Sequence, residues 1–351
     1  MRLRTPLIVA LAALPAAAVA QSASFRDWST ACSTQRTCWA FGFSPENADG
    51  LAFARIERGG AAGAEPVLVL AAGGWDAERR APTATMRISV DGRPGPVVTA
   101  RAGDTAYYVA TLGDSNVVRP LIAALRNGRT LRLQVQGWTA PADVSLTGAA
   151  AALLWLDEQQ KRVGTTTALA RTGPRPASAV PPPPPARVVR AAASVPQGRL
   201  PTAFPAAMRN NRALVECREY ETEGSETDLM AARLGAGRML WGVGCGHGAY
   251  NANYSFFIGD EQGRNLQAVQ LRPERAGDET AINAAVNPSF DARTMTLSAF
   301  AKGRGLGDCG EAEAWVWDGR AFVLVESQFM GECRDVPSAY WPTTVKADVR
   351  R

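Results

Sequence analysis

The chain has 351 residues, of which 46% are hydrophobic and 20% are charged. This composition excludes both a disordered chain and a membrane protein with many spans. The formal net charge of +5 indicates an anionic partner only if the basic residues lie together on a folded surface, so their distribution along the chain has to be examined first.

The first twenty residues have the layout of a secretory signal peptide. Arg2 and Arg4 precede a short apolar stretch, and small residues end it at Ala20. A membrane anchor is the alternative, but the stretch is shorter than the roughly 20 residues needed to cross a bilayer, and Pro15 interrupts it. We therefore expect cleavage after Ala20, export to the periplasm, and no transmembrane segment in the remaining chain.

Residues 21–170 are predicted to form a β-rich domain. The segment from Thr83 to Asp91 alternates between apolar and polar residues, and the segment from Thr130 to Gly137 does the same. Such alternation is typical of antiparallel strands with one buried face.

Two short helices are predicted in the same domain. Asn116 is the expected N-cap of a helix over residues 117–126, and a second helix is expected after Thr147. Asp157 and Glu158 lie in the second helix, where neighbouring residues point in different directions and cannot form a catalytic pair. We expect both carboxylates on a solvated face.

Residues 171–203 are predicted to be a disordered linker rich in proline, arginine and alanine. They include five consecutive prolines from Pro181 to Pro185, which favour an extended polyproline II conformation without a core. The linker carries five arginines and no acidic residue. It is either a plain spacer or a tether that holds these arginines near anionic polymers or lipid head groups.

Residues 204–351 are predicted to form a second β-rich domain. The clearest signal is a hairpin over Glu313 to Glu326, with a two-residue turn at Asp318-Gly319. Its tryptophans, Trp315 and Trp317, could stack on sugars if they were exposed, but core packing is the preferred interpretation. The fold class is therefore mainly β, or α+β, with two antiparallel domains joined by the linker.

Six cysteines lie in the exported part of the chain, in three groups of two along the sequence. An even number in an oxidising compartment favours disulfides over metal sites. Sequential pairing closes the shortest loops, so we expect the bonds Cys32–Cys38, Cys217–Cys245 and Cys309–Cys333. Three pairs of reduced thiols are the alternative.

His247 is the only histidine, and it lies between two glycines, two residues after Cys245. One histidine suffices for nucleophilic or acid–base catalysis. A disulfide-bonded Cys245 is no nucleophile, and a single histidine cannot provide a zinc site rich in histidine. We expect a structural or surface role, and His247 is the weak catalytic candidate of the sequence.

Other chemistries have little support in the sequence. Without the signal peptide and the linker, 31 basic residues stand against 33 acidic ones, so no nucleic-acid groove is expected. No pattern matches a phosphate-binding loop or a calcium loop. We expect no cofactor and no metal.

Four segments resemble the bacterial family known as domain of unknown function 1176. They are TACSTQRTCWA from Thr30, VSLTGAAAALLWLDEQQKRVGTTTAL from Val144, LWGVGCGHGAYN from Leu240, and KGRGLGDCGEAEAWVWDGRAFVL from Lys302. The most specific pattern is Asp308-Cys309-Gly310 followed by Trp317-Asp318-Gly319. The first segment is also similar to invasion associated locus B proteins of the cell envelope. The resemblance implies an exported envelope protein and supplies no reaction.

Our first hypothesis is a non-enzymatic protein that binds an envelope polymer or another protein. The second is a periplasmic hydrolase acting on cell-wall or exported substrates, with His247 and a carboxylate such as Asp260 or Asp308 as acid and base. The third is an enzyme inhibitor. The position of His247, in a concave pocket or on a flat rim, distinguishes the first two.

Overall fold

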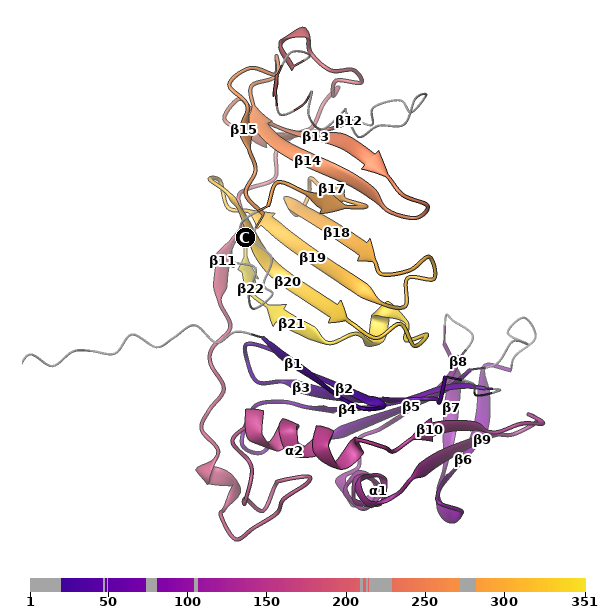
Figure 1. Cartoon of the computed structure of the whole chain (residues 1–351). Helices are drawn as coiled ribbons and strands as arrows, with labels where there is room; N and C mark the ends of the chain where they lie inside the picture. Colours follow the sequence, from indigo (N-terminus) through magenta and orange to yellow (C-terminus); the bar gives the residue numbers. More distant parts are fainter. Residues whose placement is uncertain are drawn as a thin grey trace, which may run out of the picture.

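The computed structural model describes residues 20–46, 48, 50–73, 81–103, 107–208, 211–212, 214, 229–271 and 282–351. Over these ranges the protein is mainly β with two α-helices, as the sequence predicts (Figure 1). The signal-peptide prediction falls on residues 1–20, of which only Ala20 is described, and Cys217 also lies outside the described residues.

The N-terminal half is a ten-stranded antiparallel sheet with the strand order β1-β2-β3-β4-β5-β8-β7-β6-β9-β10. The strands are β1 (Gln21–Phe25), β2 (Trp28–Cys32), β3 (Cys38–Phe43), β4 (Leu51–Arg58), β5 (Val67–Gly73), β6 (Thr83–Val90), β7 (Arg93–Ala102), β8 (Tyr107–Leu112), β9 (Thr130–Val135) and β10 (Ala142–Ser145). The alternation predicted for β6 and β9 is confirmed: Met86 and Ile88 are buried in β6, and Leu131 and Leu133 in β9.

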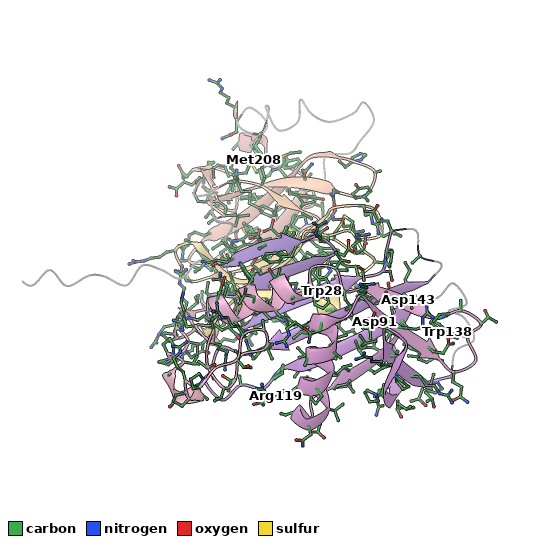
Figure 2. All side chains as sticks on the ribbon, turned by 60° about the horizontal axis from the view of Figure 1, so that its bottom comes forward. Trp28, Asp91, Arg119, Trp138, Asp143 and Met208 are labelled. Atoms are coloured by element: carbon green, nitrogen blue, oxygen red, sulfur yellow. A yellow bond between two sulfur atoms is a disulfide. The ribbon has the colours of Figure 1, made fainter. Side chains whose placement is uncertain are left out.

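Two helices cover one face of this sheet, α1 (Ser115–Asn127) and α2 (Ala149–Gln159) (Figure 1). Helix α1 begins before the predicted residue because Asp114, and not Asn116, is its N-cap: the Asp114 carboxylate accepts a hydrogen bond from the Asn116 amide at 2.9 Å. Trp28 lies in the core of this half and donates to the carbonyl of Ser145 at 2.9 Å (Figure 2).

The expectation that Asp157 faces solvent is wrong. Its carboxylate pairs with Arg58 at 2.7 Å, and both side chains are fully buried. The backbone amides of Leu169 and Ala170 donate to the same carboxylate at 2.9 and 2.7 Å. The chain that follows α2 folds back over the end of the helix and covers it, which the helical pattern alone does not show. Glu158 is exposed, as predicted.

The C-terminal half contains two five-stranded sheets. The first has the path β12-β13-β14-β15, with β16 also paired to β14, and the second has the order β17-β18-β19-β20-β21. Their strands are β12 (Leu229–Gly235), β13 (Arg238–His247), β14 (Ala252–Gly259), β15 (Gln267–Ala268), β16 (Ala285–Val286), β17 (Ser289–Asp291), β18 (Thr296–Lys302), β19 (Gly310–Trp317), β20 (Phe322–Met330) and β21 (Thr343–Lys346). One apolar cluster joins the two sheets, and it includes Trp315 and Trp317.

The hairpin predicted in this half is present as β19 and β20, but its turn is longer than predicted. Trp317 lies opposite Phe322, and Trp315 lies opposite Leu324 rather than Phe322. Asp318 causes the difference, because its carboxylate accepts hydrogen bonds from the amides of Arg320 and Ala321 at 2.7 and 2.8 Å and holds a four-residue loop. Both tryptophans are buried, at 2% and 1% exposed, so the prediction of core packing is confirmed.

The proline-rich segment differs from the disordered linker that its composition predicts. The carbonyl of Pro181 accepts a hydrogen bond from Arg36 at 3.2 Å, and Val180 and Val189 are buried. A short strand, β11 (Val188–Arg190), pairs in parallel with β22 (Asp348–Arg350) at the other end of the chain (Figure 1). Single turns of 3-10 helix lie at Ala177–Ala179, Ala206–Met208 and Ser338–Tyr340.

The two halves share an apolar core. Strand β3 is buried along its whole length because both faces of the sheet are covered. Cys38 and Ala40 face the helices, whereas Trp39, Phe41 and Phe43 pack with residues of the C-terminal half. The members of this shared core from the C-terminal half include Phe300, Cys309, Met330, Val336, Tyr340 and Trp341. Whether residues 21–170 and 204–351 fold as separate domains stays a prediction.

Candidate functional site

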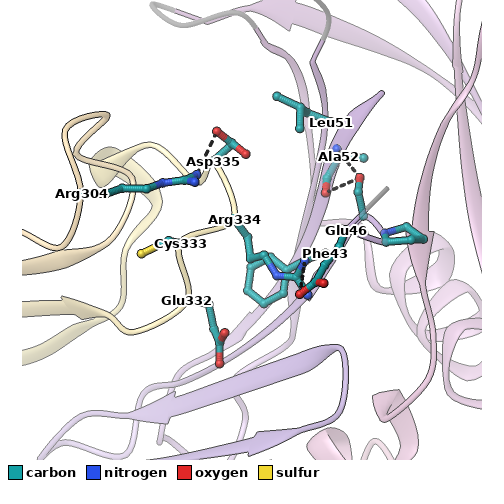
Figure 3. A pocket seen from close by; sticks show the side chains of 11 residues that line it. Phe43, Glu46, Leu51, Ala52, Arg304, Glu332, Cys333, Arg334 and Asp335 are labelled. Carbon is teal, nitrogen blue, oxygen red and sulfur yellow. Dashed lines mark hydrogen bonds and ion pairs between the residues drawn. The ribbon is translucent and has the colours of Figure 1, made fainter. Parts of the chain in front are cut away.

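A cleft of about 390 Å³ lies between the two halves, and we call it the interhalf cleft. The N-terminal half contributes the end of β3, the turn after it and the start of β4, and the C-terminal half contributes two loops next to a disulfide (Figure 3). Its lining residues are Phe43, Ser44, Pro45, Glu46, Leu51, Ala52, Arg304, Glu332, Cys333, Arg334 and Asp335. Clefts between packed units are common ligand sites.

The disulfide Cys309–Cys333 fixes the C-terminal wall of the cleft. It closes the open end of the β19–β20 hairpin, as predicted, and brings the loops before β19 and after β20 together. Gly310 follows directly with φ +133°, and a Cβ atom there would overlap the carbonyl oxygen of Ala301. Glycine is therefore required at this position.

Arg304 links the two loops through their carboxylates. Its guanidinium makes two hydrogen bonds to Asp308, at 2.7 and 2.6 Å, and one to Asp335 at 3.2 Å. Asp335 has a left-handed backbone, with φ 60°, and its amide donates to the Asp308 carboxylate at 2.6 Å. Asp308 is nearly buried, with 7% of its side chain exposed, and all of these contacts hold it in place.

The pKa values of the two aspartates shift in opposite directions, because hydrogen bonds outweigh the effect of burial at Asp308 but offset only part of it at Asp335. Burial opposes ionisation of Asp308, but the hydrogen bonds from Arg304 and from the Asp335 amide outweigh it and lower its pKa. Burial raises the pKa of Asp335, Arg304 offsets part of that rise, and the Asp308 carboxylate adds to it. Burial also raises the pKa of Tyr107, whose hydroxyl donates to the carbonyl of Asp335 at 2.9 Å.

Of the two arginines that line the cleft, Arg334 has the longer ion pair. Its guanidinium lies 3.7 Å from the Glu46 carboxylate, whose side chain is 81% exposed, and 5.9 Å from the centre of the Phe43 ring. Figure 3 shows Arg334 reaching from the C-terminal loop toward Phe43 and Glu46. The Phe43 ring covers one side of this guanidinium, and 23% of the Arg334 side chain remains exposed to an anionic group.

The structure separates the residues considered as acid and base. His247 is exposed at the end of β13, opposite Ala252, and lines neither the interhalf cleft nor two smaller cavities of the described chain. Asp260 accepts from the amides of Gln262 and Arg264 at 3.0 and 2.9 Å and holds a turn. Asp308 belongs to the wall of the cleft. Among the described residues, no hydrogen bond or ion pair joins His247 to a carboxylate.

The remaining cysteine predictions have mixed outcomes. The bond Cys32–Cys38 is present, between neighbouring ends of β2 and β3. Cys245 is disulfide-bonded, but Cys217 lies outside the described residues, so their pairing stays a prediction. Within the described part of the chain, no three metal-binding side chains are grouped as a metal ion would require. None of the described helices is both long and apolar enough to cross a membrane.

The sequence analysis found Asp308 but missed Arg304, Arg334 and Asp335. A signal existed for Arg334 and Asp335: Asp308 precedes Cys309, and these two residues follow Cys333. Residues next to the two ends of a disulfide must be near each other, so the predicted bond already grouped them. The opposite wall, from Phe43 to Ala52, depends on how the two halves pack and left no such signal.

The family model "Protein of unknown function (DUF1176)" matches residues 22–348. The chain belongs to this family. The chain is similar to the "Uncharacterized protein YpfG" of Escherichia coli (strain K12). The two are 30% identical over 362 aligned positions, which cover 98% of this chain and 99% of the relative. No solved structure matches the chain.

The DUF1176 match extends through both halves and the segment between them. The interhalf cleft is built from residues on both sides of that segment, so all of its walls lie inside the matched region. The pattern Asp308-Cys309-Gly310, which suggested the family, has a physical role for each member: an ion pair, a disulfide and a backbone position without space for a side chain.

Proposed function

We propose that this protein is an exported envelope protein that binds a ligand or partner in the interhalf cleft and does not catalyse a reaction. The observation that carries the proposal is a mainly polar cleft between the two halves, in which the partly exposed guanidinium of Arg334 has only the loosely held, exposed Glu46 as its carboxylate partner. This arrangement suits a ligand or partner with an anionic group that replaces Glu46.

Export is supported by the start of the sequence and by the cysteines. A basic start, a short apolar stretch and small residues up to Ala20 are the features of a secretory signal. The described cysteines are all oxidised, and structural disulfides persist in oxidising compartments such as the periplasm.

A binding role without catalysis is supported by how the acids are used. The carboxylate of Asp308 is occupied by Arg304 and by a backbone amide, and that of Asp260 by two amides of its own turn. Each already stabilises the fold, whereas a general acid or base needs a free site facing a substrate. His247 is exposed and lies outside the cleft.

Site-directed photo-crosslinking in living cells tests the proposal. A photoreactive amino acid replaces Glu46, at the rim of the cleft, and in a second strain replaces Val97, which is 62% exposed on β7. We expect a discrete crosslinked product from position 46 and none from position 97. In the Glu46 strain, the additional substitution Arg334→Glu should reduce the yield at least about tenfold, since a charge-assisted contact is reversed.

Two results would contradict the proposal. Equal crosslinking at positions 46 and 97 would show random collision, and no product at position 46 would show an unoccupied cleft. Alkylation of cysteines in freshly lysed whole cells tests export separately: oxidised exported protein resists the reagent, whereas reduced cytosolic protein reacts.

A further inference from the structure

Strands β11 and β22 bring two arginine-bearing segments together from distant parts of the sequence. Arg187 precedes β11 and Arg190 is its last residue, whereas Arg350 is the last residue of β22 and Arg351 follows it. In the parallel register, Val189 lies opposite Val349, and Arg190 lies directly opposite Arg350. Figure 1 shows the two strands side by side next to the C-terminal end. We call these four arginines with their two strands the arginine ribbon.

The arginine ribbon has one buried and one exposed face. Val189 is buried with Val316, Val325 and Ala347 against β19 and β20. Because side chains alternate along a strand, Val188 and Arg190 point to the opposite side, and Val188 is 49% exposed. The ribbon is therefore anchored to the C-terminal half and presents Arg190 and its partner Arg350 on the open side, while Arg187 and Arg351, just outside the paired strands, are also exposed.

The charges of the exposed face are not balanced within the protein. Arg350 pairs with Asp348 at 3.2 Å, but no ion pair joins Arg187, Arg190 or Arg351 to a carboxylate of the described residues. Like charges directly opposite each other on paired strands are destabilising. An anion between Arg190 and Arg350 would replace this repulsion with attraction, and the planar guanidinium group matches the geometry of phosphate.

We propose that the arginine ribbon binds the phosphate groups of an anionic phospholipid surface. The facing pair Arg190 and Arg350, with exposed Arg187 and Arg351 next to it in the chain, suits several phosphates in a plane, because surface arginines each add to attraction by an anionic membrane. Val188, which is 49% exposed and lies on the same side as Arg190, can contact the apolar part of a head-group region. The proposal is independent of the interhalf cleft.

Cosedimentation with vesicles tests the proposal on the oxidised protein spanning residues 21–351. The vesicles contain either phosphatidylcholine alone or equal parts of phosphatidylcholine and phosphatidylglycerol. The test variant is Arg190→Glu with Arg350→Glu. The matched control is Arg87→Glu with Arg101→Glu, which reverses the same number of charges at exposed positions on β6 and β7. Circular dichroism of all proteins verifies folding.

We expect binding to the anionic vesicles only, weakening with added salt, and a loss of at least about tenfold in affinity for the test variant alone. Equal loss in the control variant would show that net charge, not the ribbon, is responsible. Equal binding to phosphatidylcholine vesicles would overturn the electrostatic basis. Full release by millimolar inorganic phosphate at constant ionic strength would show a site for free phosphate instead of a surface.

Discussion

The protein has two clusters of arginine and aspartate that differ in burial. In the N-terminal half, Arg58 and Asp157 are fully buried, and burial lowers the pKa of Arg58 to about 10 although Asp157 partly offsets this effect. In the interhalf cleft, Arg304 is 40% exposed and Arg334 is 23% exposed. The same residue types are thus sealed in the core in one place and partly exposed to solvent in the other. Burial and completeness of pairing, not composition, separate the two clusters.

The largest effect is expected when the buried cluster is broken. Asp157→Asn leaves Arg58 as a buried charge without its counterion and weakens the hydrogen bonds from Leu169 and Ala170. We expect the free energy of unfolding to fall by about 3–5 kcal/mol, measured by urea denaturation. Glu158→Gln is the control, because Glu158 is the exposed neighbour and should change stability by less than about 0.5 kcal/mol. Similar losses in both variants would contradict the comparison.

Removal of the disulfide at the cleft should have the next largest effect. The bond Cys309–Cys333 spans 24 residues, and Cys32–Cys38 spans 6. Loop-closure entropy predicts losses of about 3 kcal/mol for Cys309→Ser with Cys333→Ser and about 2 kcal/mol for Cys32→Ser with Cys38→Ser. Only the first pair should also abolish crosslinking at position 46, since Cys333 lines the cleft. A loss of crosslinking in both variants would point to a general effect on folding.

The two aspartates of the cleft should respond to pH in opposite directions. The lowered pKa of Asp308 means that its contribution to stability is present above its ordinary pKa and is lost as the pH falls through the lowered value. The raised pKa of Asp335 favours its protonated form, so its unfavourable contribution appears as the pH rises through the raised value.

Denaturation of single variants at pH 3 and pH 7 measures this difference. Asp308→Asn should cost about 1–3 kcal/mol at pH 7 and less at pH 3. The change in the free energy of unfolding caused by Asp335→Asn should be more favourable to the folded protein at pH 7 than at pH 3. The assignment of the two roles fails if the pH dependences are the same or reversed.

The smallest effect is expected at His247. Because its side chain is exposed and outside the cleft, His247→Ala should change the free energy of unfolding by less than about 0.5 kcal/mol and leave crosslinking at position 46 unchanged. A variant that folds normally but loses a biological activity would restore the hydrolase hypothesis.

Local patterns in the sequence predicted much of the fold. Alternation in β6 and β9 depends on residues two apart, and the Cys309–Cys333 bond depends on residues flanking one hairpin, so both are visible in short segments. The turn at Asp318 was predicted too short because the carboxylate of Asp318 holds two amides that a dipeptide pattern does not consider.

Features that depend on distant segments were not predictable in this way. Asp157 pairs with Arg58, 99 positions away in the sequence. Because the helical pattern does not show a partner so far away, this charged residue at a helix end was predicted to be exposed. The same reason applies to the interhalf cleft, whose walls come from both ends of the chain. The composition of the proline-rich segment predicted a disordered linker, because composition does not show that β22, at the other end of the chain, pairs with β11.

The shared aromatic core determines how the two halves should behave when the chain between them is cut. Phe41, Phe53 and Trp341 are buried only because the two halves cover each other, and Phe53 lies 5.5 Å from Tyr340 between ring centres. Cleavage at a protease site inserted near the exposed Pro182 should therefore leave two fragments that remain associated. Either fragment made alone would present this aromatic surface to water and aggregate, whereas coexpression of both should restore a soluble split protein.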